Sequence, residues 1–441
     1  MTDPSEFIAR HPNLERFEVI LIDINGIPRG KWLPASGIEK AFKSGVNFPY
    51  SVYGNDVWGR EAPETGLHIS TGDRDGVERP IPSTLSLVPG TDGRAAQALF
   101  SMERPDGSPF MADPRQVLKS IVGGFTGKGI KPVVAFELEF YLFEIAEPSA
   151  PPKPVFSTYE EPVRQNMYDL GDLDRLAPFL DDLRRGGDEL ELPLDASVSE
   201  ASPGQFEVNL SHRADPLRAA DDAVLLKRMI VGLARKHGYI ASFMAKPVAD
   251  WPGNGMHIHA SMMGKDGNIF ANEDGETRLG HAIQGLLATM PDALLLFISS
   301  FNGFRRLQPG SYAPTGICWG HDNRSVAIRV PASKPEARRI EHRIAGADAN
   351  PYLVLAAILA GVEKGLNEAI TPPPPVDGSA YDQATTPLTS RFNEAIEAFA
   401  NSRWAKAAFG ELLHRVITEV KRQEDRAFQT AITPLERETF L

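Results

Sequence analysis

The chain has 441 residues, of which 42% are hydrophobic and 24% are charged, so it can form one large or two smaller globular domains with a sizeable core. Its formal net charge of −12 disfavours unaided binding to nucleic acid or to an anionic membrane, because both select basic surfaces. The single cysteine, Cys318, excludes an internal disulfide and fits a reducing compartment.

No segment has the pattern of a membrane-spanning helix. The N-terminal residues contain no apolar stretch typical of a secretory signal. The most apolar segment, residues 286–301, contains Pro291 and Asp292, and residues 353–362 are far fewer than the roughly 20 that a spanning helix needs. We therefore expect a soluble, cytoplasmic protein without a membrane partner.

The first hundred residues read as short strands and loops. Residues 17–34 predict two strands that flank an Asn25-Gly26 turn, because this dipeptide favours the backbone of a two-residue hairpin. The pattern of short strands and loops ends between Met102 and Asp113. We therefore predict a first domain over residues 1–107 and a second over residues 108–441.

Helices alternate with strands in the second region. Asp215-Pro216 predicts a helix start, with a capping carboxylate followed by a proline in the first turn, and Gly238 predicts its end. Asn350-Pro351 predicts the start of a second, more apolar helix in the same way.

Residues 133–143 have the composition of a strand. Because side chains alternate between the two faces of a strand, Glu137 and Glu139 share one face, with Cβ atoms roughly 7 Å apart. Two carboxylates so placed repel each other unless a cation lies between them. A strand with one solvated face is the alternative interpretation.

Two more carboxylates flank a turn at Pro203-Gly204. Glu200 precedes this turn, and Glu207 lies within an alternating segment that follows it. The spacing predicts a second strand that presents Glu207 on its polar face.

Residues 256–261 predict a strand that presents His257, His259 and Ser261 on one face. Two histidines at this spacing after a glycine-rich loop favour a ligand role. Hydrogen-bonded structural histidines are the alternative.

Residues 339–343 alternate charges on one strand face, where Arg339, Glu341 and Arg343 point the same way. A plain ladder of surface ion pairs is the alternative. Taken together, five glutamates and a histidine on short strands favour Mg²⁺ or Mn²⁺ over zinc. The arginines between residues 305 and 343 bind anions through a planar fork, so the combination indicates phosphoryl transfer.

Six segments carry a resemblance to the glutamine synthetase family, from about Phe17 to the C-terminus. They are FELEF, ExxPGQxE, NGMHIHAS, NGFRRLQPGSYAP, NRSVAIRVP and ARRIEHRIAGADANPYLVLAAILAG. The resemblance implies an α+β fold, with an N-terminal β-grasp-like domain and a C-terminal catalytic domain whose curved antiparallel sheet is flanked by helices. It also implies a homo-oligomer, expected as a dodecamer of two stacked hexamers with active sites between subunits.

The resemblance assigns roles to residues that match its motifs. It implies at least two Mg²⁺ or Mn²⁺ ions per site and ATP as co-substrate. The implied metal ligands are Glu137, Glu139, Glu200, Glu207, His257 and Glu341. The implied ATP-binding residues are Glu207, His259, Ser261, Arg329 and Arg339. The implied substrate-binding residues are Gly253, Asn254, Arg306, Arg343 and Trp319. The implied catalytic residues are Arg306, Tyr312, Arg324 and Arg343.

The chemistry implied by the resemblance has two steps. ATP phosphorylates the γ-carboxylate of glutamate, and a nitrogen nucleophile then displaces phosphate from the acyl phosphate. Glutamine synthetases hold ammonium with acidic side chains, but this chain has Tyr312 in its PGSYAP loop and Pro49 in NFPYSV at the matching positions.

An aromatic side chain packs against an alkylammonium group through cation–π and apolar contact, so the two departures predict an organic amine. The PGSYAP loop resembles the γ-glutamylpolyamine and γ-glutamylamide synthetase branch of the family. Two alternatives stay open. One is an ordinary glutamine synthetase in which Tyr312 only packs, and the other is a non-catalytic structural or regulatory assembly.

Overall fold

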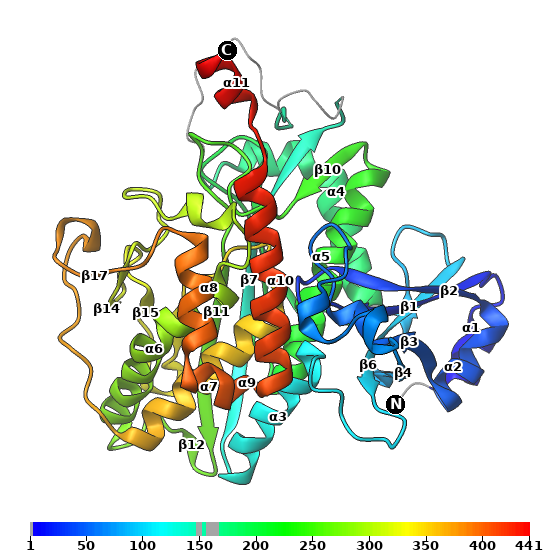
Figure 1. Cartoon of the computed structure of the whole chain (residues 1–441), viewed down its shortest axis with the longest axis horizontal. Helices are drawn as coiled ribbons and strands as arrows, with labels where there is room; N and C mark the ends of the chain where they lie inside the picture. Colours follow the sequence, from blue (N-terminus) through cyan, green and yellow to red (C-terminus); the bar gives the residue numbers. More distant parts are fainter. Residues whose placement is uncertain (1–2, 147–151, 156–166) are drawn as a thin grey trace.

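The computed structural model describes residues 3–146, 152–155 and 167–441. Two β-sheets organise these residues, a smaller one near the N-terminus and a larger one that helices flank (Figure 1). The smaller sheet, blue and cyan in Figure 1, lies to one side of the larger one, and helix α10 crosses in front of the latter.

The smaller sheet has the order β2-β1-β6-β4-β3, with β5 paired to β6. Strands β1 and β6 are parallel, whereas the other pairs in this sheet are antiparallel. Its strands are β1 (Arg16–Ile22), β2 (Pro28–Pro34), β3 (Val46–Pro49), β4 (Asp75–Pro80), β5 (Ser86–Leu87) and β6 (Ala95–Glu103).

The larger sheet has the order β14-β15-β16-β11-β7-β9-β8, with β10 paired to β7 and β12 to β11. Its pairs are antiparallel except for β14 and β15, which are parallel. Its strands are β7 (Lys131–Glu144), β8 (Leu194–Ser199), β9 (Gln205–Leu210), β10 (Tyr239–Ser242), β11 (Met256–Gly264), β12 (Gly267–Asn268), β14 (Trp319–His321), β15 (Ile328–Val330) and β16 (Ile340–His342). A separate pair joins β13 (Gly316–Ile317) to β17 (Thr386–Pro387).

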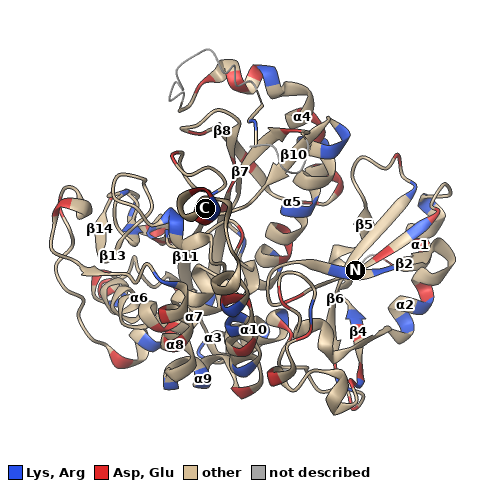
Figure 2. Ribbon diagram, turned by 45° about the horizontal axis from the view of Figure 1, so that its top comes forward, with Lys and Arg blue, Asp and Glu red and all other residues tan. Residues whose placement is uncertain are grey.

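Helices pack beside both sheets, and basic and acidic residues are interspersed along them (Figure 2). The helices are α1 (Pro4–Arg10), α2 (Ile38–Ser44), α3 (Pro114–Gly127), α4 (Leu170–Glu189), α5 (Pro216–Lys236), α6 (Gly275–Phe297), α7 (Pro351–Glu368), α8 (Phe392–Asn401), α9 (Arg403–Phe409), α10 (Glu411–Thr430) and α11 (Pro434–Phe440). Among the described residues, no helix combines the length and apolar character needed to cross a membrane.

The predicted turn at Asn25-Gly26 is confirmed, and it also joins the two sheet regions. Gly26 has φ of +74°, and a Cβ there would lie 3.2 Å from the Cα of Asn350. Asn350 donates a hydrogen bond to the carbonyl of Asp23 (2.8 Å), and Lys421 donates one to Asn25 (2.6 Å). The hairpin therefore contacts the start of α7 and the side of α10. Glycine fits at position 26 because a larger residue would come too close to Asn350.

The predicted helix starts are also confirmed, since the side chains of Asp215 and Asn350 accept hydrogen bonds from the first turns of α5 and α7. The α+β fold class is confirmed as well. The domain boundary at residues 107 and 108 lies between β6 and α3 and stays a prediction.

A buried ion pair ties three helices together behind the larger sheet. Arg115 on α3 donates two hydrogen bonds to Asp221 on α5 (2.8 and 2.9 Å), and the hydroxyl of Tyr352 on α7 donates a third (2.7 Å). Asp221 is fully buried, so removing its carboxylate leaves the Arg115 charge without compensation.

We expect Asp221→Ala to lower the free energy of unfolding by about 3–5 kcal/mol, because a buried charge loses its partner. Asp188→Ala, which removes an exposed ion pair with Arg184, should leave it nearly unchanged. Urea denaturation of the three proteins measures this difference. Equal midpoints for Asp221→Ala and Asp188→Ala would contradict the structural role of Asp221.

Candidate active site

A cavity of about 570 Å³ opens on the polar face of the larger sheet. Strands β7, β9, β11 and β16 supply its floor, and loops before and after β14 and β15 supply its walls. The predicted residues that line it are Glu137, Glu139, Glu200, Glu207, Gly253, His257, Arg306, Tyr312, Arg324, Arg329, Glu341 and Arg343.

Strand register brings the predicted metal ligands together. His257 on β11 lies directly opposite Glu137 on β7, and Glu139 on the same strand lies opposite Glu207 on β9. Glu341 on β16 lies opposite His259. Because residues directly opposite each other have Cβ atoms about 5 Å apart, four neighbouring strands place these six side chains in one layer.

Both histidines bind Glu137. The Nε2 atom of His259 lies 2.8 Å from one carboxylate oxygen, and the Nδ1 atom of His257 lies 3.3 Å from the other. Arg339 donates a hydrogen bond from Nε to Nδ1 of His259, so the proton of this ring is on Nε2 and faces Glu137. Burial opposes the charged carboxylate, but the two histidine bonds outweigh it and hold the pKa of Glu137 well below its usual range.

Two other carboxylates are shifted in the opposite direction. Burial and the neighbouring charge of Glu139 raise the pKa of Glu200 to about 8. Burial, with Glu137 and Glu139 nearby, raises the pKa of Glu207 to about 9. Four carboxylates this close are stable in their charged forms only when cations neutralise them.

The donor set therefore fits divalent cations. Ligand atoms of Glu137, Glu207 and His257 lie within 4.8 Å of one another, and so do those of Glu137, His259 and Glu341. Both groups are rich in carboxylate oxygen with one imidazole, which suits Mg²⁺ or Mn²⁺. Glu137 belongs to both groups, and His259 joins the second one although the resemblance assigned it to ATP.

Arginines surround Glu341 on the other side. Arg329 donates a hydrogen bond to one oxygen of Glu341 (2.7 Å), and Arg343 pairs with the other. Burial opposes ionisation, but Arg343 and the nearby histidines lower the pKa of Glu341 to about 2. The buried Nε atoms of Arg329 and Arg343 have no hydrogen-bond partner among the described residues, which leaves donors for a bound anion.

Arg306 is buried and held by the backbone. It donates hydrogen bonds to the carbonyls of Ile344 (2.8 Å) and Arg343 (3.5 Å), while its side chain lines the cavity. Burial lowers the pKa of Arg306. A Cβ on Gly253 would lie 2.8 Å from Cγ of Arg306, and one on Gly255 would lie 2.7 Å from its Nη2. Glycine at both positions thus lets the backbone approach this guanidinium.

The PGSYAP loop covers the mouth of the cavity. Tyr312 has φ of +57°, and its side chain is 58% exposed. Tyr381 donates a hydrogen bond from its hydroxyl to the carbonyl of Ala313 (3.0 Å), which fixes the loop beside Tyr312. Met167 and Tyr168, both exposed, line the same cavity, and Tyr168 also has a positive φ of 66°. These two residues were not identified from the sequence, because they belong to no motif.

Five predicted residues do not line the cavity. Asn254 is fully buried and bonds the carbonyls of Ser242 and Met244, so it supports the loop from behind. Trp319 is buried and donates its indole N–H to the carbonyl of Pro373 (2.7 Å). The other three lie on the strands that form the floor or beside them: His259, Ser261 and Arg339.

Two cavity residues that sequence reasoning missed are Gln205 and Asn209. Gln205 donates hydrogen bonds to the carbonyl of Gly253 (3.1 Å) and to the side chain of Asn254 (3.2 Å). It therefore positions the glycine-rich loop. Its place in the ExxPGQxE segment was the available signal.

The N-terminal segment with Pro49 lies outside this cavity. Ser51 donates a side-chain hydrogen bond to Asp73 (2.8 Å) and a backbone one as well (3.0 Å). The segment thus has a carboxylate beside Ser51, although Pro49 stands at the position that was compared with an aspartate.

A ring of carboxylates that fits divalent cations, beside arginines with free donors, defines a phosphoryl-transfer site. Comparison with known proteins identifies the family to which the chain belongs. Residues 111–440 match the family model for the glutamine synthetase catalytic domain, so the chain belongs to the glutamine synthetase family, as the motifs predicted.

Two curated relatives align over most of the chain. Gamma-glutamylputrescine synthetase PuuA of Escherichia coli (strain K12) is 37% identical and covers 99% of this chain and 93% of its own. Glutamate--isopropylamine ligase of a Pseudomonas species is 32% identical and covers 92% of this chain and 90% of its own. A solved structure described as a GmaS/ADP complex is 26% identical, has a TM-score of 0.87, and covers 100% of this chain and 99% of its own.

We expect Mn²⁺ affinity to rise with pH, because cation binding requires Glu200 and Glu207 in their charged forms. Between pH 6 and 8 each unit should tighten binding about tenfold for one released proton and up to a hundredfold for two. The increase should end above about pH 9. Calorimetric titration in two buffers of different ionisation enthalpy counts the protons. Binding that is independent of pH, or an unchanged proton count in Glu207→Gln, would contradict these shifts.

Proposed function

We propose that this protein is an ATP-dependent ligase that joins the γ-carboxylate of glutamate to an organic amine through a γ-glutamyl phosphate. The observation that carries the proposal is the composition of one cavity. It combines carboxylates that fit divalent cations, arginines with free donors, and an exposed tyrosine at the mouth. The two relatives that act on glutamate and amines support the same reaction.

Glu137, Glu139, Glu200, Glu207, His257 and Glu341 are the residues that would hold Mg²⁺ or Mn²⁺. When bound, the ions supply positive charge that offsets the negative charge of the transferring phosphoryl group. The chain's own contribution is to hold the carboxylates in charged form and in one layer. Arg329 and Arg339, on either side of Glu341, are proposed to contact the ATP phosphates.

Glutamate binding requires cations for its carboxylates. Arg306 and Arg343 are buried at the base of the cavity, and Arg324 is exposed at its rim. We assign them to the substrate carboxylates and the transferring group, because a guanidinium binds such oxygens through parallel hydrogen bonds. Gly253 would let the substrate approach the backbone. In the first step the γ-carboxylate oxygen attacks the terminal phosphorus of ATP and ADP leaves.

In the second step the amine nitrogen attacks the acyl carbon, the bond to the phosphate oxygen breaks, and the nitrogen loses a proton. Tyr312, Tyr168 and Met167 surround the entrance from which an amine arrives. Their rings and thioether offer cation–π and apolar contact to an alkylammonium group. Ammonium has no alkyl group for these contacts, so they favour an organic amine.

Three finer features belong to the proposal. The amine is a polyamine such as putrescine, a monoamine or ethanolamine. The active protein is a ring-shaped homo-oligomer, a dodecamer of two stacked hexamers, and it works in the cytoplasm. Trp319 is proposed to shape the amine site indirectly, through its hydrogen bond to the loop that contains Pro373.

An amine panel tests the reaction. With ATP, glutamate and Mg²⁺ or Mn²⁺, we expect phosphate release to be at least ten times more efficient with one of putrescine, spermidine, ethanolamine or isopropylamine than with ammonium. The measurement is kcat/KM for each nucleophile. Ammonium outperforming every organic amine would identify an ordinary glutamine synthetase, and no phosphate release with any nucleophile would indicate a non-catalytic assembly.

Replacing Glu341 by alanine should abolish ATP use with every amine, because the cation site loses a carboxylate that two arginines hold ionised. Phosphate release measures this loss, and an unaltered thermal midpoint without metal shows that the fold persists. Phosphate release above one tenth of the wild-type rate would contradict the assignment.

We expect Tyr312→Ala to raise KM for the preferred amine by about 3- to 30-fold, which corresponds to the loss of one cation–π contact. Formation of the acyl phosphate from glutamate and ATP should continue, and positional isotope exchange in ATP without amine measures it. Tyr239→Phe, on strand β10 away from the cavity, is the matched control. Equal losses in both half-reactions would contradict the role of Tyr312.

A further inference from the structure

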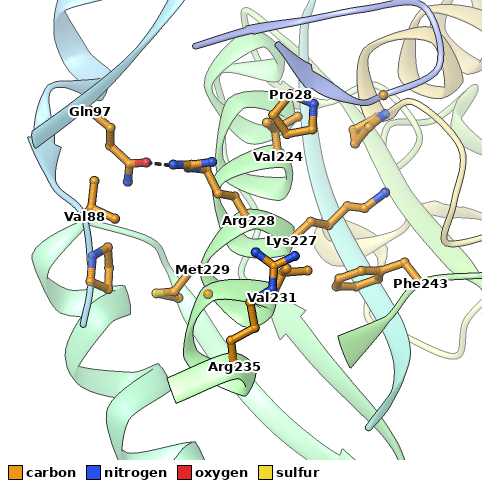
Figure 3. Close-up of a pocket in the computed structure, with 14 residues that line it drawn as sticks. Pro28, Val88, Gln97, Val224, Lys227, Arg228, Met229, Val231, Arg235 and Phe243 are labelled. Atoms are coloured by element: carbon orange, nitrogen blue, oxygen red, sulfur yellow. Dashed lines mark hydrogen bonds between the residues drawn. The ribbon is translucent and has the colours of Figure 1, made fainter. Parts of the chain in front are cut away.

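A second cavity, of about 400 Å³, lies between the smaller sheet and helix α5 (Figure 3). Strand β6 and its preceding loop form one wall, the face of α5 forms another, and the tip of the β1–β2 hairpin closes one end. None of its lining residues lines the cavity described above.

Two cations in this cavity form no ion pair with a carboxylate of the residues that the structure describes. Lys227 donates one hydrogen bond, to the carbonyl of Ala347 (2.7 Å), and its Nζ lies 5.2 Å from the centre of the Phe243 ring. Arg235 lies eight residues further along α5, about two helical turns away, and directs its guanidinium back toward the centre of the cavity (Figure 3). Among the described residues no ion pair joins either side chain to a carboxylate.

The third cation is already neutralised. Arg228 donates a hydrogen bond to Gln97 (2.9 Å, dashed in Figure 3) and pairs with buried Glu18. The acidic group that faces Lys227 is Asp348, whose negative charge offsets part of the charge of Lys227. Ser300 donates a hydrogen bond to Oδ2 of Asp348 (2.6 Å), and Oδ1 has no hydrogen-bond partner among the described residues. Of the three cations of α5 that line the cavity, Arg228 is paired, Lys227 is offset in part by Asp348, and Arg235 forms no ion pair with a described carboxylate, so a net positive charge remains on this side of the cavity.

The rest of the lining is mostly apolar. Its apolar members come from α5, from the segment before β11, and from β2 and the loop after β5, and they include Pro28, Val88, Val224, Met229, Val231 and Phe243. An apolar cavity with a few convergent cationic groups suits a small molecule that has one anionic end and an apolar body.

We propose that this interdomain cavity binds a small organic carboxylate, whose carboxylate contacts Lys227 and Arg235 and whose apolar body packs on Phe243 and the valines. This site is separate from the proposed ligase site and does not depend on the ligase reaction. Lys227 has two unused N–H donors and Arg235 has its full set, so both can donate to carboxylate oxygens. The surrounding protein lowers the pKa of Lys227 to about 8 by desolvation, and a bound anion relieves that penalty.

The cavity is also connected to the ligase site through the backbone. The Ala347 carbonyl that accepts from Lys227 belongs to a residue whose N–H donates to the carbonyl of Asn254 (3.0 Å). Asn254 is bound by Gln205, which lines the ligase cavity. A ligand that moves Lys227 away from the Ala347 carbonyl therefore affects a residue hydrogen-bonded to Asn254, which directly follows Gly253 of the ligase cavity.

Calorimetric titration with acetate, butanoate, hexanoate and 3-phenylpropanoate tests the proposal on the whole protein, with saturating glutamate, ATP analogue and Mg²⁺ to occupy the ligase site. We expect affinity to rise from acetate to hexanoate, and the neutral hexanamide to bind at least tenfold more weakly than hexanoate. Lys227→Met should weaken hexanoate binding at least tenfold, and Arg235→Gln should weaken it at least threefold. Lys236→Gln, the neighbouring cation that pairs with Asp182, should not change it.

Equal binding of hexanoate and hexanamide, hexanoate binding that the saturated ligase site prevents, or full affinity in Lys227→Met would overturn the proposal. If Lys227→Met fails to fold, the proposal is still tested by Arg235→Gln, at an exposed position, and by a measurement on the wild-type chain. Hexanoate should slow acetylation of Lys227 by acetic anhydride, followed by mass spectrometry, and leave Lys236 acetylation unchanged. Equal rates at Lys227 with and without hexanoate would also overturn the proposal.

Discussion

Mutual repulsion among carboxylates on one face of the larger sheet is the constraint on which the site depends. The register of β7, β9 and β11 forces Glu137, Glu139 and Glu207 into one layer, and Glu200 joins them from the end of β8. The histidines stabilise the charge on Glu137, whereas Glu200 and Glu207 have raised pKa values. Such a layer costs stability unless cations bind it, so its existence is itself an argument for metal-dependent chemistry.

The sequence predicted well which side chains share a face of one strand, but it predicted poorly which strands lie next to each other. Alternation placed Glu137 and Glu139 on one face, because the period of a strand is two whatever its neighbours are. It could not show that β7 lies between β11 and β9, since these strands are far apart in the chain; only the family resemblance supplied that grouping. The indole bond of Trp319 to Pro373, 54 residues away, and the exposed positions of Met167 and Tyr168 had no signal in the sequence.

The two ends of the proposed ligase cavity are built differently. Its floor consists of strand residues fixed by register and buried ion pairs, which suits groups that must be held rigidly around phosphate and glutamate. Its mouth consists of loop residues, with Tyr312 and Tyr168 in left-handed backbone conformations that a non-glycine residue adopts at some cost. In the proposed function the rigid part holds the phosphate and glutamate groups, and the strained part contacts the amine. The Lys227–Ala347–Asn254 connection links the cavity between the smaller sheet and α5 to the rigid part.

An organic amine and ammonium, as competing nitrogen donors, can be compared in a single reaction. It contains the protein with glutamate, ATP and Mg²⁺ or Mn²⁺, and equal concentrations of ammonium, putrescine, ethanolamine and isopropylamine. Mass spectrometry of the products then compares glutamine with the γ-glutamyl amides. We expect one γ-glutamyl amide to be the main product at every time point, whereas glutamine as the main product would show that ammonium is the preferred nitrogen donor.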